Sequence, residues 1–160
     1  MANGRVERRL AVIMATDIVG YSRLTEADEI RTLGTMKRLQ TSILAPSIAA
    51  CGGRIVKLMG DGTLVVFDSA VNAVDCALSL QEALASDQLE QPPDDRILVR
   101  IGINLADVVI EGDDLLGDGV NVAARLQASA SPVAYASPMS SIGNSAPRTD
   151  RPSSTAARSR

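Results

Sequence analysis

Apolar residues form short, nearly continuous runs at residues 10–15, 55–59, 63–67 and 97–103. Runs of this length, bounded by polar or glycine-containing segments, are typical of strands buried in a sheet. The second and third runs are separated by Gly60, Asp61 and Gly62. An Asp-Gly pair between two such runs predicts a β-hairpin with a type I′ turn, which would expose Asp61 at its tip.

Between these runs, two longer segments repeat apolar residues every three or four positions, which predicts amphipathic helices. The first starts at a segment resembling a capping box, residues 25–28, and Pro46 predicts a kink or a restart within it. The second follows Ser69, a candidate N-cap. A third, shorter helix is predicted from Asp118, after the acidic loop at 111–117.

The order strand, helix, hairpin, helix, strand predicts the α+β class. We expect a ferredoxin-like βαββαβ core, in which an antiparallel sheet carries its helices on one face. Residues 108–110 either extend the last strand or form the next one. The chain has the length of one domain, which we place at 8–128 after an N-terminal arm at 1–7. Residues 129–160 are rich in Ser, Ala, Pro and Arg and lack apolar periodicity, which predicts a disordered tail.

Composition argues against several classes of function. With one Phe, two Tyr, no Trp and a net charge of −3, the chain lacks the stacking rings and the basic field of a nucleic-acid-binding domain. Its apolar runs are far shorter than the roughly 20 residues of a membrane span, and no secretory leader opens it, which predicts a cytoplasmic protein. Because the sequence contains no His, any bound metal would be held by oxygen ligands.

Two aspartates lie beside apolar runs. Asp17 follows the first run, and Asp61 lies in the turn between the second and third runs. In the predicted core these strands are neighbours, so the two carboxylates would meet at one end of the sheet. Carboxylates completed by substrate phosphates suit Mg²⁺, and two such ions activate an attacking oxygen and neutralise a leaving one. Gly20 would let backbone amides approach a polyphosphate closely. Taken alone, Asp61 would be an ordinary turn residue.

Two further pairs of polar residues are candidates for substrate contacts. Asn121 and Arg125 are four residues apart, on one face of the predicted third helix, and could hold a ribose oxygen and a phosphoryl oxygen in a transition state. Lys57 and Asp114 could donate and accept hydrogen bonds at a purine edge. For each pair the alternative is a solvated polar surface.

Longer motifs contain these residues, namely DIVGYS at 17–22, GRIVKLMGDG at 53–62, RIGIN at 100–104 and GVNVAARL at 119–126. Their order and spacing resemble the catalytic domain of the class III nucleotidyl cyclases, the bacterial adenylate/guanylate cyclase family. The resemblance covers residues 8–128. It implies a homodimer that converts a nucleoside triphosphate, here ATP, to the 3′,5′-cyclic monophosphate and pyrophosphate with two Mg²⁺ or Mn²⁺ ions per site.

The resemblance also implies a role for each candidate residue. One protomer would bind the metals and its partner would supply the residues that select adenine and stabilise the transition state. The metal residues would be Asp17, Asp61 and the backbone carbonyl of Ile18, with Gly20 and Tyr21 beside the substrate. The partner would supply Lys57 and Asp114 for adenine, which favours ATP over GTP, and Asn121 and Arg125 for the transition state.

Two features depart from the family pattern. Ala106 stands where many relatives have Gly, and the family's final strand and hairpin, with a phosphate-binding basic residue, have no counterpart in 129–160. We therefore expect a truncated or frame-shifted cyclase domain. An inactive cyclase-like regulatory or dimerisation partner is the main alternative. An unrelated ferredoxin-like binding module is another, but the spacings of the two polar pairs argue against it.

Overall fold

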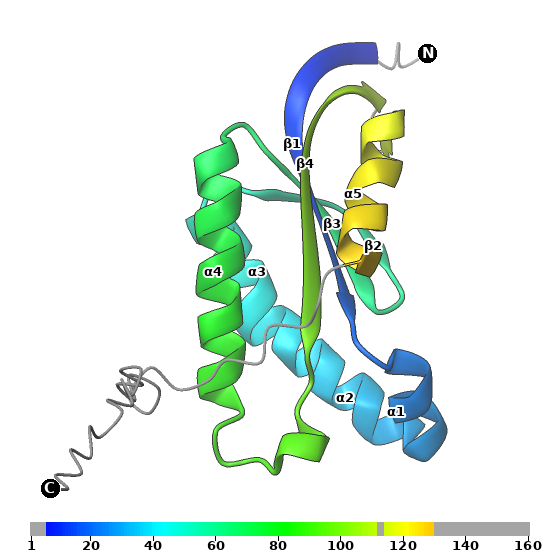
Figure 1. Cartoon of the computed structure of the whole chain (residues 1–160), viewed down its shortest axis with the longest axis vertical. Helices are drawn as coiled ribbons and strands as arrows, with labels where there is room; N and C mark the ends of the chain where they lie inside the picture. Colours follow the sequence, from blue (N-terminus) through cyan, green and yellow to red (C-terminus); the bar gives the residue numbers. More distant parts are fainter. Residues whose placement is uncertain (1–5, 112–113, 130–160) are drawn as a thin grey trace, which may run out of the picture.

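The computed structural model describes residues 6–111 and 114–129 and contains a curled, five-stranded antiparallel sheet (Figure 1). The strand order is β2-β3-β1-β4-β5, and the first four strands have the order of a ferredoxin-like βαββαβ core. The predicted fold class is therefore confirmed. The strands are β1 (Val6–Ile18), β2 (Arg54–Met59), β3 (Gly62–Phe67), β4 (Val99–Glu111) and β5 (Asp114–Leu116).

Helices cover both faces of this sheet (Figure 1). The helices of the core lie on one face as predicted, and the last helix packs on the other, against β4 and β1. The helical segments are α1 (Tyr21–Ala27), α2 (Glu29–Leu39), the π-helical η1 (Gln40–Leu44), α3 (Ala45–Ala50), α4 (Ala70–Asp87), the 3₁₀ turn η2 (Pro93–Asp95) and α5 (Asp118–Ser129). In this part of the chain no helix has both the length and the apolarity to cross a membrane.

The two faces have separate cores because side chains alternate along a strand. Val12 and Met14 of β1 pack in a cluster with Ala73 and Cys76 of α4. The residues between and beside them, such as Ile13, pack in a second cluster that includes Ala123 of α5. The continuous apolar run at 10–15 is thus explained by burial on both sides.

The first helical segment differs from its prediction in where it begins, and its predicted interruption is a π-helical segment. It starts at Tyr21, not at residues 25–28, and Asp28 instead caps α2 by accepting a hydrogen bond from the backbone N–H of Arg31 at 2.9 Å. The break predicted from Pro46 is present, since η1 precedes α3 and the N–H of Ala45 donates to the carbonyl of Gln40, five residues earlier.

The hairpin turn and the strand ends also correct the sequence interpretation. Gly60 has a φ of 54° but Asp61 keeps a negative φ, so the predicted type I′ turn, which needs positive φ at both positions, is wrong. Strand β1 already starts at Val6, inside the predicted arm. Strand β4 is continuous through 108–110, and β5 forms within the predicted acidic loop. The predicted tail starts at Ser129, which is instead the last residue of α5, and residues 130–160 lie outside the described residues.

Alternate residues of β4 hold α5 against the sheet. The side-chain N–H of Asn104 donates to the carbonyl of Gly119 at 3.1 Å, near the start of α5, and Nη1 of Arg100 donates to the carbonyl of Ala128 at 3.1 Å, near its end. Between them, a Cβ on Gly102 would overlap backbone atoms of α5. The three residues 100, 102 and 104 share one strand face because side chains repeat every second position, so the RIGIN motif is a docking surface for α5.

We expect Gly102→Ala to lower the free energy of unfolding by about 2 kcal/mol, because the added methyl group would meet the backbone of α5, which cannot rotate away. Gly34→Ala is the matched control: Gly34 lies within α2 with nothing within 4 Å of an added Cβ, and we expect it to raise that free energy by about 0.5–1 kcal/mol. Urea unfolding of both variants tests this. Equal effects of the two substitutions would contradict the close packing of α5 on Gly102.

Candidate active site

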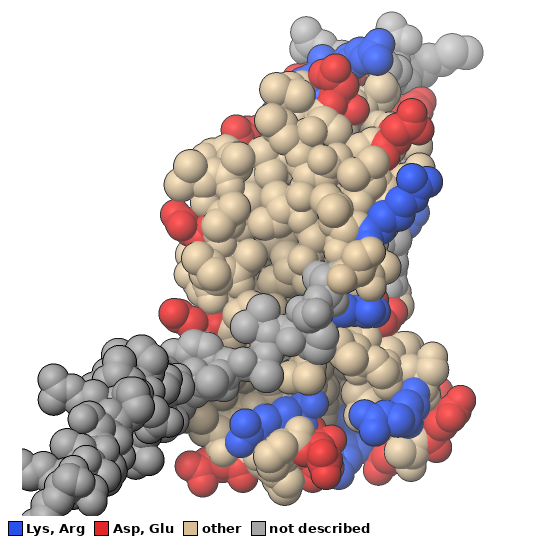
Figure 2. Space-filling model, viewed as in Figure 1, with Lys and Arg blue, Asp and Glu red and all other residues tan. Residues whose placement is uncertain are grey.

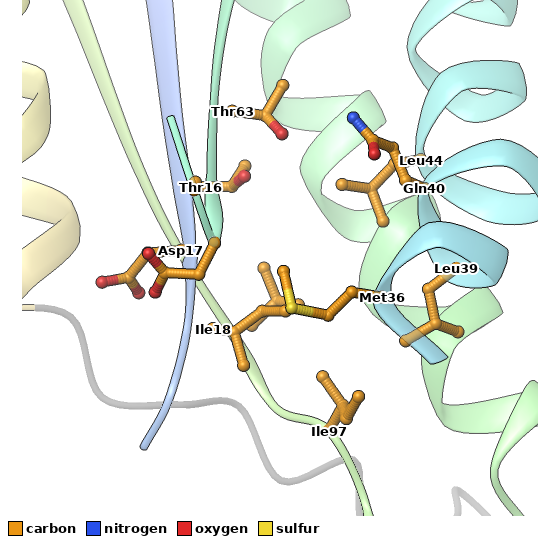
Figure 3. A pocket seen from close by; sticks show the side chains of 13 residues that line it. Thr16, Asp17, Ile18, Met36, Leu39, Gln40, Leu44, Thr63 and Ile97 are labelled. Atoms are coloured by element: carbon orange, nitrogen blue, oxygen red, sulfur yellow. The ribbon is translucent and has the colours of Figure 1, made fainter. Parts of the chain in front are cut away.

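The end of β1, the β2–β3 turn and the α2–η1 segment line a cavity of about 40 Å³. Asp17 and Asp61 both line it, so the structure brings the two predicted metal-binding residues to one place. Thr16 and Thr63, paired across β1 and β3, are also among its lining residues, and both are buried. Asp17 lies on the side of the cavity away from its apolar wall of Met36, Leu39 and Leu44 (Figure 3).

Asp17 forms a two-point ion pair with Arg100, its register partner on β4. Nε of Arg100 donates to Oδ1 of Asp17 at 3.0 Å, and Nη2 donates to Oδ2 at 2.9 Å. The side chain of Arg100 is 28% exposed and that of Asp17 is 22% exposed, so the pair is partly shielded from water. The hydrogen bonds that Arg100 donates to Asp17 raise the pKa of Arg100 above its ordinary value, burial opposes this shift, and the charges of Asp17 and Asp61 add to it.

The residues that follow Asp17 turn the chain into α1. Ile18 is the last residue of β1 and lines the cavity, which agrees with a location beside Asp17 and Asp61. Gly20 has a φ of 66°, a left-handed conformation that glycine adopts without strain, and precedes Tyr21, the first residue of α1. The segment 17–21 therefore forms the junction between the cavity and the helices on this face.

The second group of predicted residues lies on α5, which packs on the sheet face opposite α2 and α4. Asn121 and Arg125 are both exposed and one turn apart, on one face of the helix as predicted. Neither residue lines the cavity that contains Asp17 and Asp61. Within one chain, the pair on α5 is therefore not part of that cavity.

The predicted adenine pair lies on the two edge strands. Lys57 is an exposed residue of β2, and Asp114 is the first residue of β5. Because the sheet curls, β2 and β5 approach each other although they are at opposite ends of the strand order. The side chain of Asp114 is outside the described part of the structure, so the pairing stays a prediction.

Comparison with known proteins establishes the family. The sequence profile of the adenylate and guanylate cyclase catalytic domain matches residues 7–141. The chain belongs to this family. The resemblance found in the four motifs is thus confirmed, and the fold described above is that of a cyclase catalytic domain.

Individual relatives of this cyclase domain are similarly named. A Rhizobium meliloti protein named "Putative adenylate cyclase 3" is 49% identical over 132 residues, which are 82% of this chain and 22% of that protein. An adenylate cyclase of Streptomyces coelicolor is 40% identical over 121 residues, 76% of this chain and 30% of its own length. The chain therefore spans less than a third of these two relatives.

Solved structures give the same family. The crystal structure named adenylate/guanylate cyclase/hydrolase from Silicibacter pomeroyi is 47% identical, with a TM-score of 0.76 over 80% of this chain and 74% of that one. The guanylyl cyclase Cya2 is 26% identical, with a TM-score of 0.70 over 79% of this chain and 73% of that one. The cyclase domain thus resembles structures named for either nucleotide.

The cavity of the cyclase domain can be tested for its fit to divalent ions. In residues 6–111 and 114–129, no three acidic or Cys side chains gather into a metal site, so the chain offers two carboxylates, Asp17 and Asp61. Such an incomplete donor set suits Mg²⁺, which usually keeps several waters and is bound by one or two carboxylates together with substrate phosphates. The residues present therefore fit ions that bind together with a polyphosphate substrate.

Sequence reasoning missed several residues of this cyclase domain that line the cavity or contact Asp17. Thr16 and Thr63 each stand one or two residues from an aspartate, which was a usable signal. Gln40 lines the cavity and is the first residue of η1, and the sequence predicted an interruption at Pro46 but not a π-helical segment. Arg100 was visible only as one charge in an apolar strand, since its partner Asp17 is 83 residues away.

Proposed function

We propose that this cyclase domain converts ATP to 3′,5′-cyclic AMP and pyrophosphate at a homodimer interface, with two divalent ions, Mg²⁺ or Mn²⁺, at each site. The observation that carries the proposal is the separation of the site residues into two groups. Asp17 and Asp61 share a cavity, whereas Asn121 and Arg125 are exposed on α5 and outside it. The names of the two relatives described above support the adenylate rather than the guanylate activity.

A second copy of the chain would complete the site. The cavity of about 40 Å³ is much smaller than the ligand pockets of roughly 300 Å³ or more that enclose small molecules, so one chain does not enclose a nucleotide there. In a two-fold dimer, the α5 face of one protomer can meet the cavity of its partner, and symmetry repeats the contact. Apolar side chains available for association include exposed Leu10, Leu105 and Leu126.

Charge and apolar surface are distributed unevenly over the described part of the domain, and α4, on the sheet face opposite α5, carries exposed apolar side chains of its own. Figure 2 shows few Lys, Arg, Asp or Glu side chains over α4 and β4, with the charged residues around the margins. On α4, Val71, Val74 and Leu78 are 68%, 47% and 61% exposed. Surfaces with such exposed apolar side chains mark sites of association more often than a uniformly charged surface does.

The reaction would proceed by direct displacement at phosphorus. The ribose 3′ oxygen forms a bond to the α-phosphorus, the bond from that phosphorus to pyrophosphate breaks, and the 3′ proton passes to a carboxylate, water or substrate phosphate. Bound divalent ions would activate the 3′ oxygen and neutralise charge on the departing pyrophosphate. Positioning and charge neutralisation supply most of the rate, which is why a site without His suffices.

Each group of residues would have a distinct task in that displacement. Asp17, Asp61 and the carbonyl of Ile18 would hold the ions, and the backbone at Gly20 and Tyr21 would lie beside the polyphosphate. Asn121 would orient the ribose, and Arg125 would neutralise charge that develops on the α-phosphoryl oxygens. Lys57 and Asp114 would bind adenine, whose edge offers one acceptor and one amino donor. An ATP substrate agrees with the predicted cytoplasmic location.

A regulatory, non-catalytic partner is the second candidate, and one observation favours it. Both oxygens of Asp17 are already bound by Arg100, as they would be in a site that never holds metal. Such a chain would bind a complete cyclase domain through the same α5 face without turning over ATP.

The deciding experiment measures cyclic AMP formed from ATP, and cyclic GMP formed from GTP, by the purified chain with Mg²⁺ or Mn²⁺. We expect cyclic AMP as the main product and a specific activity that increases with protein concentration, because the site needs two protomers. A folded chain that forms neither product at any concentration would contradict the catalytic proposal and support the regulatory one. A specific activity independent of concentration in a monomer would contradict the interface site.

A further inference from the structure

The role of Arg100 follows from its position between the two groups of site residues, and it rests on the proposed function. Its guanidinium binds Asp17 through two nitrogens, at 3.0 and 2.9 Å, and the carbonyl of Ala128 through the third, at 3.1 Å. Asp17 belongs to the cavity, and Ala128 belongs to the last turn of α5, the helix that carries Asn121 and Arg125.

We propose that Arg100 is an internal counter-ion that competes with the divalent cation for Asp17 and keeps metal affinity low until a nucleotide is bound. A carboxylate has about four lone-pair positions, and the side-on guanidinium occupies one on each oxygen of Asp17. A cation on the remaining positions would lie within a few ångströms of a permanent positive charge. The repulsion between them opposes binding of the metal alone.

The nucleotide would remove this obstacle by supplying negative charge. A triphosphate brings oxygens that coordinate the ion and compensate the guanidinium at the same time, so metal and nucleotide bind together more readily than the metal alone. Asp61, which also acts electrostatically on Arg100, would then be neutralised by the same ion. Until that point, Arg100 balances the charge of Asp17 and keeps an unpaired carboxylate from destabilising the end of β1.

Arg100 would keep a hydrogen-bond partner, the carbonyl of Ala128, once Asp17 is bound to metal. The carbonyl of Ala128 lies at the carboxyl end of α5, where the helix dipole is negative and attracts a cation. A guanidinium that loses its carboxylate partner therefore keeps one hydrogen bond on the docking surface formed by residues 100, 102 and 104. This makes release from Asp17 less costly than full exposure of the charge would be.

The test is the affinity of the full chain for Mn²⁺ without nucleotide, measured by calorimetry or by the electron paramagnetic resonance of free Mn²⁺. Arg100→Met keeps the length of the side chain and removes its charge, so we expect a dissociation constant about tenfold lower than that of the wild type. Arg100→Lys keeps the charge, and we expect an affinity close to that of the wild type. An unchanged or weaker affinity in Arg100→Met would overturn the proposal.

Arg38 provides a matched control variant. It forms a two-point pair with Asp87 through Nη1 and Nη2, at 3.0 and 2.8 Å, and neither residue lines the cavity. Arg38→Met should therefore leave Mn²⁺ affinity unchanged, whereas a rise equal to that of Arg100→Met would mean that net charge alone decides and would overturn the proposal.

A measurement on the wild-type chain covers the case in which Arg100→Met does not fold. The Nε–H resonance of Arg100, assigned from its loss in Arg100→Lys, should shift when Mg²⁺ and a non-hydrolysable ATP analogue are added together, and much less with Mg²⁺ alone. An equal shift with Mg²⁺ alone, or none with both, would overturn the proposal. If neither Mn²⁺ nor Mg²⁺ binds even with nucleotide, the metal site of the proposed function itself is wrong.

Discussion

Replacing Asp61 with asparagine is expected to lower kcat for cyclic AMP formation by about a thousandfold, because divalent ions supply several kcal/mol of transition-state stabilisation. The substitution keeps the shape of the side chain and removes the charge that would bind the ion. It should not disturb the hairpin, since Gly60 and not Asp61 has the positive φ in the turn. Initial rates at saturating ATP and Mn²⁺ measure the effect.

Folding and pairing must be checked beside the rate of Asp61→Asn. The urea midpoint and the sedimentation of this variant should match those of the wild type. The loss of kcat can then be attributed to the chemical step and not to unfolding or to loss of the dimer. Asp94→Asn is the control, because Asp94 is an exposed residue of η2 and does not line the cavity. It should retain full activity. If Asp61→Asn remains as active as Asp94→Asn, the two-metal assignment is wrong.

Mixing the two inactive variants Asp61→Asn and Arg125→Ala is expected to restore part of the cyclase activity. Asp61→Asn damages the cavity and Arg125→Ala damages α5, so a heterodimer has one site with both defects and one intact site. With random pairing of equal amounts, half of the dimers are heterodimers and half of their sites are intact, which predicts about a quarter of the wild-type specific activity. Activity of co-refolded mixtures, against each variant alone, measures this.

The matched control for that mixture combines two defects of the same group. Asp61→Asn mixed with Asp17→Asn leaves every site without one metal-binding carboxylate, whichever protomers pair. No recovery is expected there. Recovery in this control, or none in the first mixture when both variants still form dimers, would contradict a site shared between protomers.

The pattern of apolar residues predicted the strands and most helices. This was possible because a buried strand or helix face requires apolar residues at regular positions, and these positions can be read from the sequence. The alternation of Val12 and Ile13 between two cores, for example, requires the unbroken apolar run at 10–15 that is visible in the sequence. The turn type was missed because Asp and Gly both tolerate positive φ, and sequence alone did not tell which one would adopt it.

The candidate site was predictable only in part, for a physical reason. Residues such as Asp17 and Asp61 stand beside strand ends and glycines, so local sequence marks them. The contact of Arg100 with Asp17 depends on the register of two strands far apart in the sequence, and its contact with Ala128 depends on how α5 docks. Long-range register of this kind is set by the packing of the whole sheet and leaves no local pattern.

The long pairing of β1 with β4 has a consequence for how the chain folds during synthesis. These strands pair over all 13 residues of each, yet Asp17 and Arg100 are 83 residues apart, so a large loop must close before the pairing forms. The β2–β3 hairpin with Asp61 is local and can form early. A ribosome-bound chain that ends before β4 would therefore present the hairpin and helices with one side of β1 unpaired, and would depend on chaperones until residue 111 has emerged.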